Sequence, residues 1–203
     1  MANGGIIGPP NIPTSTTATG VWQQEEQYEA KVTDTWPQRT LFTTKSLRFE
    51  NSSSDYLNRT PSSASNRKTF TFSFWVKRTK LGTNDTIYNV RPDSNGANRI
   101  SFHSSDTFRI ALEPINKYLF TNRVFRDVSA WYHIVAAFDT TQGTASNRVK
   151  IYINGVQETS FSTATYPDQD ADLDINTTNV INLGRDLETS SDFIDMYLAE
   201  FVF

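Results

Sequence analysis

A two-residue alternation of apolar and polar side chains dominates the chain from about residue 47 onward. It is clearest over residues 69–77, where Phe70, Phe72, Phe74 and Val76 alternate with Thr71, Ser73, Trp75 and Lys77. Successive side chains of a β-strand point to opposite faces, so this stretch predicts a strand that turns its phenylalanines toward a core. Residues 100–102, 108–112 and 149–153 repeat the alternation. The pattern therefore predicts an all-β fold.

Polar turn signals separate these strands. Asn154-Gly155 lies between alternating stretches and predicts a tight hairpin, because both residues tolerate positive φ. Residues 104–106 predict another turn. Residues 131–138 are nearly continuously apolar, which predicts a central strand covered on both faces. Many short strands without a helical segment favour a jelly-roll sandwich of two antiparallel sheets, and we expect it to span residues 46–203.

Composition excludes several classes of protein. The 203 residues contain no cysteine, which rules out a disulfide framework and a thiolate metal site. Aromatic residues make up 13%, more than a disordered chain would carry. The net charge is only −3, and the basic residues are spread singly along strand-like segments, so we expect no nucleic-acid partner. No apolar stretch approaches the ~20 residues of a membrane span, so we also expect no membrane contact.

Residues 1–45 differ from the rest of the chain. Glycine and proline interrupt the first 13 residues, and a Ser/Thr-rich run follows. We expect an anchoring arm that is mostly extended, with a short helix at 21–32 as its one regular element. The aromatic residues Trp22, Tyr28 and Trp36 are the candidates for docking on another protein. An arm that packs on its own domain, or an ordinary terminal tail, remains the alternative.

Several stretches together resemble the laminin-G-like, concanavalin A-like domain family. They occur in the order typical of that family, as residues 69–77 (containing SFWVK), 131–136 (WYHIVA), 149–156 (VKIYINGV) and 183–185 (LGR). The resemblance implies a concanavalin A-like jelly-roll sandwich with an extended N-terminal arm. Members of the family usually continue beyond their last strand, whereas this sequence stops at Phe203; a shortened chain and a natural C-terminus both stay open as alternatives.

The opening segment resembles structural proteins of marine tailed bacteriophages. The matching stretches are residues 3–10 (NGGIIGPP), 20–22 (GVW), 28–30 (YEA) and 36–37 (WP). The resemblance implies a virion structural protein of the tail or capsid surface, assembled in the host cytoplasm. Its arm would dock on other virion proteins and its lectin-like sandwich would face outward. We expect a homo-oligomer of closed symmetry, with a trimer preferred.

Carbohydrate binding is the second hypothesis. The protein would then be a free-standing lectin-like module, or its displayed sandwich would attach to host surface glycans. Sugar sites combine aromatic faces with amide, carboxylate and guanidinium groups. The aromatic candidates are Trp75, Tyr88, Tyr118 and Tyr166, and packing between strands is the alternative role for each.

Acidic residues raise the question of calcium, whose preferred ligands are oxygen atoms. The spacing of two residues would place Asp168, Asp170 and Asp172 on one face of an extended segment, and Asp139 follows a predicted strand. The EF-hand pattern is absent, so an exposed acidic loop is the favoured interpretation. We expect no cofactor, with calcium at these residues as the one alternative.

Catalysis is the least favoured function, and we expect no enzyme. Glycoside hydrolases of this shape place paired carboxylates on one strand, and Asp192, Asp195 and Glu200 are the nearest candidates. Asp195 and Glu200 are five positions apart, so they face opposite sides of a regular strand unless a bulge intervenes. His103 and His133, the two histidines, have no partner arrangement typical of triad or zinc chemistry, and we expect a structural role for His133.

Overall fold

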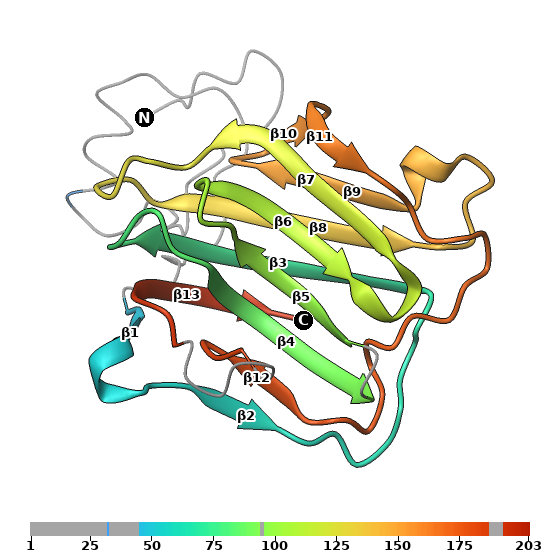
Figure 1. The fold of residues 1–203 in the computed structure, drawn as a ribbon, viewed down its shortest axis with the longest axis horizontal. Coiled ribbons are helices and arrows are strands. Elements are labelled where there is room, and N and C mark those ends of the chain that lie inside the picture. The colour runs from blue at the N-terminus through green and yellow to red at the C-terminus, as the bar shows by residue number, and fades with distance from the viewer. Residues whose placement is uncertain (1–31, 33–44, 94–95, 187–192) are drawn as a thin grey trace, which may run out of the picture. The chain divides into compact units, whose positions relative to one another are not determined.

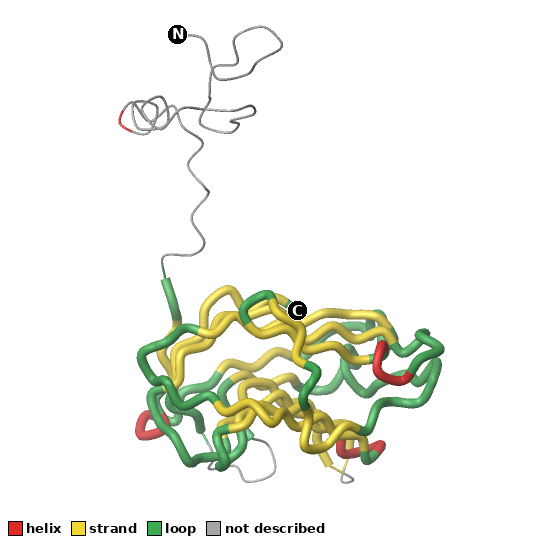
Figure 2. The backbone as a smooth tube through the Cα atoms, turned by 90° about the horizontal axis from the view of Figure 1, so that it is seen from above, coloured by secondary structure: helices red, strands yellow, loops and turns green. Residues whose placement is uncertain are grey.

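The computed structural model describes residue 32 and residues 45–93, 96–186 and 193–203. From Lys45 onward the chain forms one compact unit, in which two antiparallel β-sheets lie face to face (Figure 1). Viewed from above, the strands separate into two layers (Figure 2). The expected all-β sandwich is confirmed. The predicted arm and its helix at 21–32 lie outside the described residues, apart from Val32.

The first sheet has six strands. In spatial order they are β1 (Leu47–Phe49), β13 (Met196–Val202), β3 (Thr69–Arg78), β8 (Tyr132–Asp139), β9 (Val149–Ile153) and β10 (Val156–Glu158). The long strand β3 pairs Phe72 with Ala136 of β8, and its other edge pairs Val76 with Leu198 of β13. The Phe-rich strand seen in the sequence therefore occupies the middle of a sheet.

The second sheet has seven strands. In spatial order they are β11 (Phe161–Ala164), β7 (Lys117–Val124), β6 (Thr107–Leu112), β5 (Gly96–Phe102), β4 (Asp85–Asp93), β12 (Ile181–Leu183) and β2 (Leu57–Arg59). Strands β4, β5 and β6 run side by side in Figure 1. Neighbouring strands that are far apart in sequence, such as β4 and β12, depend on the tertiary fold for their pairing.

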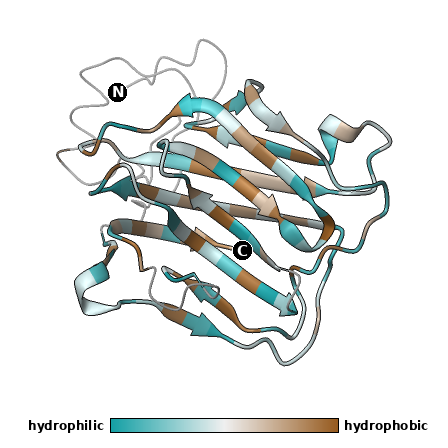
Figure 3. Cartoon of the chain, in the orientation of Figure 1, coloured by the Kyte–Doolittle hydropathy of each residue, from teal (hydrophilic) through white to brown (hydrophobic). Residues whose placement is uncertain are grey.

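The core lies between the sheets and is built from the apolar positions of the alternation. Phe72 and Phe74 of β3 are fully buried, and so is Ile110 of β6. Apolar and polar residues alternate as bands along the strands in Figure 3. Each fully buried large side chain contributes about 1.5–3 kcal/mol through removal of apolar surface from water. The shared apolar face holds the two layers together.

The predicted hairpins are confirmed. Strands β9 and β10 are joined by Asn154 and Gly155, whose φ angles are 51° and 81°. Strands β5 and β6 are joined through residues 104–106, where Asp106 has a φ of 65°. Positive φ is tolerated best by Gly, Asn and Asp, which explains the residue types at both turns.

The expectation that residues 131–138 form a strand covered on both faces is half wrong. Strand β8 is central in its sheet, and Ile134, Ala136 and Phe138 are buried. The alternate residues His133 and Val135 are only partly buried. The six-stranded sheet packs against its partner through one face, so the side chains on the other face keep access to solvent.

Helical structure after residue 45 consists, in the described residues, of three short 3-10 turns: η1 (Asn51–Ser53), η2 (Glu113–Ile115) and η3 (Ala145–Asn147). Among the described residues, no helix has the length and apolar character that a membrane crossing requires.

Candidate functional site

Polar side chains occupy the outer face of the seven-stranded sheet at its centre. Tyr88 of β4, Ile100 of β5 and Ile110 of β6 point into the core. Since side chains alternate along a strand, their neighbours Asn89, Arg99 and Arg109 point to the outer face. Asn89 lies opposite Arg99 in the paired strands, and Arg109 lies opposite Ser101. Amide and guanidinium groups thus collect on one face.

Asp186, which follows β12, joins this group. It accepts hydrogen bonds from Asn89 Nδ2 at 3.1 Å and from Thr86 Oγ1 at 3.2 Å. It also forms an ion pair with Arg99 Nε at 3.0 Å. Asp186 is 8% exposed and Arg99 is 5% exposed. Charges buried to this extent are stabilised only when they are paired, so the network holds its members in fixed positions.

Glu113 forms the other side of the network. Its carboxylate pairs with Arg99 Nη1 and accepts a hydrogen bond from the backbone N–H of Ala97 at 3.0 Å. The close approach requires a glycine at position 96, because a Cβ there would lie 2.7 Å from Glu113 Cβ. Gly96 also has a φ of 127°, which other residues rarely adopt. The backbone of β5 is therefore shaped around this carboxylate.

The network retains unused hydrogen-bonding capacity. Asn182 of β12 lies directly opposite Asn89, and both side chains are fully buried. Asn89 Oδ1 and Asn182 Nδ2 have no hydrogen-bond partner. A buried polar atom without a partner costs about 1–3 kcal/mol. Both atoms are closed off from solvent, so they belong to the interior of the network and not to an open ligand surface.

Two aromatic rings flank the polar groups. Tyr118 and Phe120 lie on β7 with ring centroids 5.8 Å apart. Phe120 is opposite Arg109 and Tyr118 is opposite Ala111 in the paired strands. We call Asn89, Arg99, Arg109, Glu113 and Asp186, together with Tyr118 and Phe120, the outer-face site. It combines oriented polar groups with apolar rings, the combination that recognises ligands with both hydroxyls and C–H faces.

The predicted glycan-binding residues do not come together. Tyr118 belongs to the outer-face site, whereas Trp75 lies on the outer face of the other sheet, where it stacks on His133 at 4.9 Å. His133 Nε2 is 3.1 Å from Ser73 Oγ. Tyr166 is partly buried against the core, and burial raises its pKa.

Tyr88 is a correction to the sequence-based prediction. It is 1% exposed and its ring lies 4.8 Å from that of Phe72 in the core. Burial raises the pKa of its hydroxyl far above the usual value. A tyrosine on the core face of β4 offers no open ring surface to a sugar, because the alternation turns Tyr88 inward and Asn89 outward.

The residues predicted for calcium make other contacts. Asp139 accepts hydrogen bonds from the Thr141 hydroxyl and backbone and from Gln142 Nε2, and these bonds hold its pKa below the usual value. Asp168 pairs with Lys117 at 3.0 Å, and Asp170 is 3.9 Å from Lys68. The Asp172 backbone carbonyl accepts from Arg67. Among the described residues, no group of three or more acidic or histidine side chains is arranged for a metal ion.

Trp22, Tyr28 and Trp36, predicted for docking, and Asp192, predicted as a catalytic alternative, lie outside the described residues. The other two residues considered for catalysis, Asp195 and Glu200, have different local structures. Asp195 precedes β13, and its Oδ1 accepts a hydrogen bond from the Asn51 backbone. Glu200 has a φ of 49°, at an irregularity between Ala199 and Val202 that supplies the bulge a regular strand lacks.

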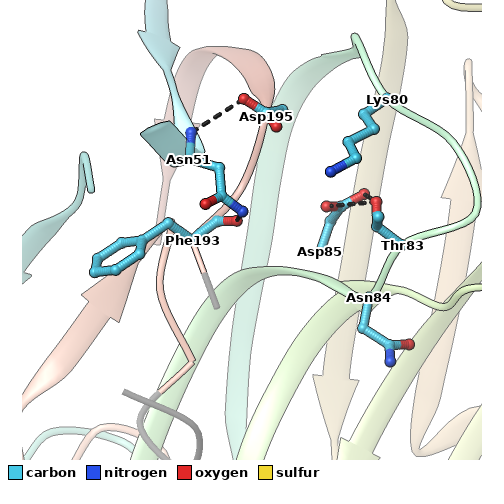
Figure 4. Close-up of a pocket in the computed structure, with 7 residues that line it drawn as sticks. All are labelled: Asn51, Lys80, Thr83, Asn84, Asp85, Phe193 and Asp195. Atoms are coloured by element: carbon cyan, nitrogen blue, oxygen red, sulfur yellow. Dashed lines mark hydrogen bonds between the residues drawn. The ribbon is translucent and has the colours of Figure 1, made fainter. Parts of the chain in front are cut away.

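A polar pocket of about 200 Å³ lies beside Asp195 at one end of the sandwich (Figure 4). It is lined by Asn51, Lys80, Thr83, Asn84, Asp85, Phe193 and Asp195. Figure 4 shows the Lys80 ammonium pointing toward the Asp85 carboxyl. Burial raises the pKa of Asp85 to about 6, although the Arg78 guanidinium and the Thr83 hydroxyl act in the opposite direction.

Arg78 links this pocket to the core. It is fully buried and bridges Asp85 at 3.2 Å and Asp106 at 3.0 Å. Burial alone would raise the pKa of Asp106, but hydrogen bonds from Gly82, Arg126 and Arg78 outweigh it and lower that pKa. The contacts tie the β3–β4 loop to the β5–β6 turn. Asp85 is therefore committed to a structural ion-pair network.

Comparison with known proteins identifies the family and the fold. The profile described as the concanavalin A-like lectin/glucanases superfamily matches residues 51–203. Domains LG4-5 of the mouse laminin α1 chain superpose with a TM-score of 0.57 at 12% identity, covering 81% of this chain and 43% of that one. The LG1-3 region of the laminin α2 chain superposes with a TM-score of 0.52 at 12% identity. That match covers 72% of this chain and 28% of the laminin fragment. The chain thus spans less than half of each laminin fragment. No curated protein matches the sequence.

Proposed function

The chain belongs to the concanavalin A-like lectin/glucanases superfamily, and from that membership we propose that its β-sandwich is a carbohydrate-binding module. The observation that carries the proposal is the outer-face site. Its partly exposed polar side chains, Arg109 and Glu113, carry hydrogen-bonding groups, and Tyr118 and Phe120 lie beside Arg109 on the next strand. Hydroxyl groups of a sugar fit the first feature, and the C–H face of a sugar ring fits the second.

A glycan array probed with the full chain tests the proposal. We expect binding to a restricted set of glycans. Tyr118→Ala should weaken that binding by about two- to tenfold, the range for loss of one aromatic contact. Trp75→Ala is the matched control, because Trp75 lies on the opposite sheet. Absence of any glycan binding, or a loss caused by Trp75→Ala and not by Tyr118→Ala, would overturn the proposal.

We propose further that the module binds its sugar without cleaving it. The raised pKa of Asp85 would suit a general acid, but its carboxylate is occupied by Arg78 and Thr83. Incubation of the protein with any polysaccharide that it retains should release no product. Release of product that disappears in Asp195→Ala or Glu200→Ala would establish the hydrolase alternative.

The role in a virion remains a separate proposal, which rests on the resemblance of the N-terminal segment to phage structural proteins. In that role residues 1–45 attach the chain to other virion proteins, and the sandwich presents the outer-face site to host glycans. Deletion of residues 1–45 should abolish incorporation into particles and leave glycan binding unchanged. Incorporation of the shortened chain at the normal level would refute the anchoring role.

A further inference from the structure

We propose that the outer-face site takes a sugar that carries a carboxylate, and that Arg109 receives this group. The inference rests on the proposed carbohydrate-binding function and adds the chemical class of its ligand. It starts from a difference between the two arginines of the site, which lie on the neighbouring strands β5 and β6 of the same face.

Arg99 is neutralised by its surroundings. Its guanidinium pairs with Glu113 through Nη1 and with Asp186 through Nε. These two carboxylates come from different parts of the chain, one after β6 and one after β12. The charge of Arg99 is thus balanced within the protein, and its role is to orient the network.

Arg109 has no such pairing. Its Nε donates a hydrogen bond to Ser101 Oγ at 2.7 Å, which fixes the plane of the guanidinium. Among the residues that the structure describes, no carboxylate forms an ion pair with Arg109. Partial burial and the nearby Arg99 charge lower the pKa of Arg109, and they outweigh the opposite effect of the Glu113 and Asp186 carboxylates, which are near Arg109 but form no ion pair with it. A cation that is held in place, partly removed from water and close to a second cation is stabilised by an added anion.

The shape of the guanidinium selects the anion. With Nε bound to Ser101, the two Nη atoms remain as a planar pair of donors, and this pair matches the two oxygens of a carboxylate. Phe120 lies opposite Arg109 on the next strand, roughly 4.8 Å away in the sheet. A sugar ring against Phe120 and Tyr118 can therefore place an attached carboxylate over Arg109.

Matched oligosaccharides test this assignment on the full chain. The probes are an oligosaccharide of uronic acids and the same oligosaccharide after reduction of its carboxyl groups to alcohols. We expect the acidic form to bind the wild-type protein about ten- to a hundredfold more tightly, the range for hydrogen bonds to a charged group. Arg109→Gln should abolish that preference, and Arg109→Lys should restore only part of it, because lysine keeps the charge without the planar fork.

Arg48→Gln is the control, because Arg48 lies on the six-stranded sheet and pairs with Glu50. The Arg48→Gln variant should retain the preference for the acidic form. Thermal unfolding should show separately that the Arg109→Gln variant is folded. Equal binding of the two oligosaccharides, or an unchanged preference in Arg109→Gln, would overturn the carboxylate assignment and leave the proposed function standing. Tighter binding of a sulfated than of a uronic form would also overturn it. If neither oligosaccharide binds and no glycan on the array binds, the proposed function is overturned as well.

Discussion

At the scale of single residues, several charged groups lie buried between or beside the sheets. Arg78 is the extreme case, since its guanidinium is fully buried, contacts two carboxylates and the Phe125 carbonyl, and lies 4.7 Å from the Phe102 ring centre. Such a group is tolerated only because its charge is matched on several sides. Removal of one partner leaves the others buried and uncompensated.

Arg78→Ala should therefore reduce the free energy of unfolding by about 3–5 kcal/mol, as expected for a broken buried ion pair. Arg48→Ala, which removes an arginine from an exposed pair with Glu50, should cost about 0–1 kcal/mol. Chemical denaturation of the two variants and the wild type measures both values. Equal losses would contradict the structural role assigned to Arg78.

Asp85 should make stability depend on pH in an unusual direction. Its pKa is about 6 in the folded chain against an ordinary value of 3.8, so the folded state binds a proton that the unfolded state releases. The stabilisation is present below about pH 4 and is lost as the pH rises through about 6, with a magnitude on the order of 3 kcal/mol. In the Asp85→Asn variant, the free energy of unfolding should no longer fall between pH 4 and 6. Chemical denaturation of the variant and the wild type at each pH measures this. A wild-type slope in the variant would show that another group causes the dependence.

At the scale of single elements, the tight turns set the register of the hairpins. Gly155 has a φ of 81°, and a Cβ at that position would meet no other atom within 4 Å. The only penalty for a side chain there is the left-handed backbone conformation. The effect of conformation can thus be measured without interference from packing.

Gly155→Ala should destabilise the protein by about 1–2 kcal/mol, the cost of a left-handed conformation for an L-residue. Gly143→Ala is the control, because a Cβ there also meets no atom within 4 Å and its φ lies outside the strained range. Thermal unfolding of both variants gives the comparison. An equal effect at the two glycines would contradict a type I′-like turn at 154–155.

At the scale of the whole molecule, the described residues from 45 onward contain a complete core between their two sheets. The boundary predicted from the sequence places the sandwich at residues 46–203. We expect a fragment of these residues to fold without the arm and to unfold in one cooperative step, as small single domains usually do. Calorimetry on the fragment and on the full chain tests this, and a fragment without a cooperative transition would refute the boundary.

The local features of the fold could be predicted from the sequence. Period-two alternation at residues 69–77 predicted β3, and Asn154-Gly155 predicted the β9–β10 hairpin, because both signals act between neighbours in the chain. The same alternation could have predicted that Asn89 and Tyr88 face opposite sides. It could not show which side was the core, so Tyr88 was assigned to a glycan site.

The outer-face site depended on the tertiary structure. Charged or amide residues at the polar positions of strands, such as Arg99 and Arg109, were visible in the sequence, and so was Asp186 after Gly184-Arg185. Asp186 joins the arginines only because β12 pairs with β4, across a separation of about 90 residues that no local pattern encodes. The sequence by itself determined the strands, the turns and the apolar stripe that buries the core, since these follow from side-chain direction and backbone preference. Only the tertiary structure decided which strands became neighbours, and with that choice which polar side chains share one face.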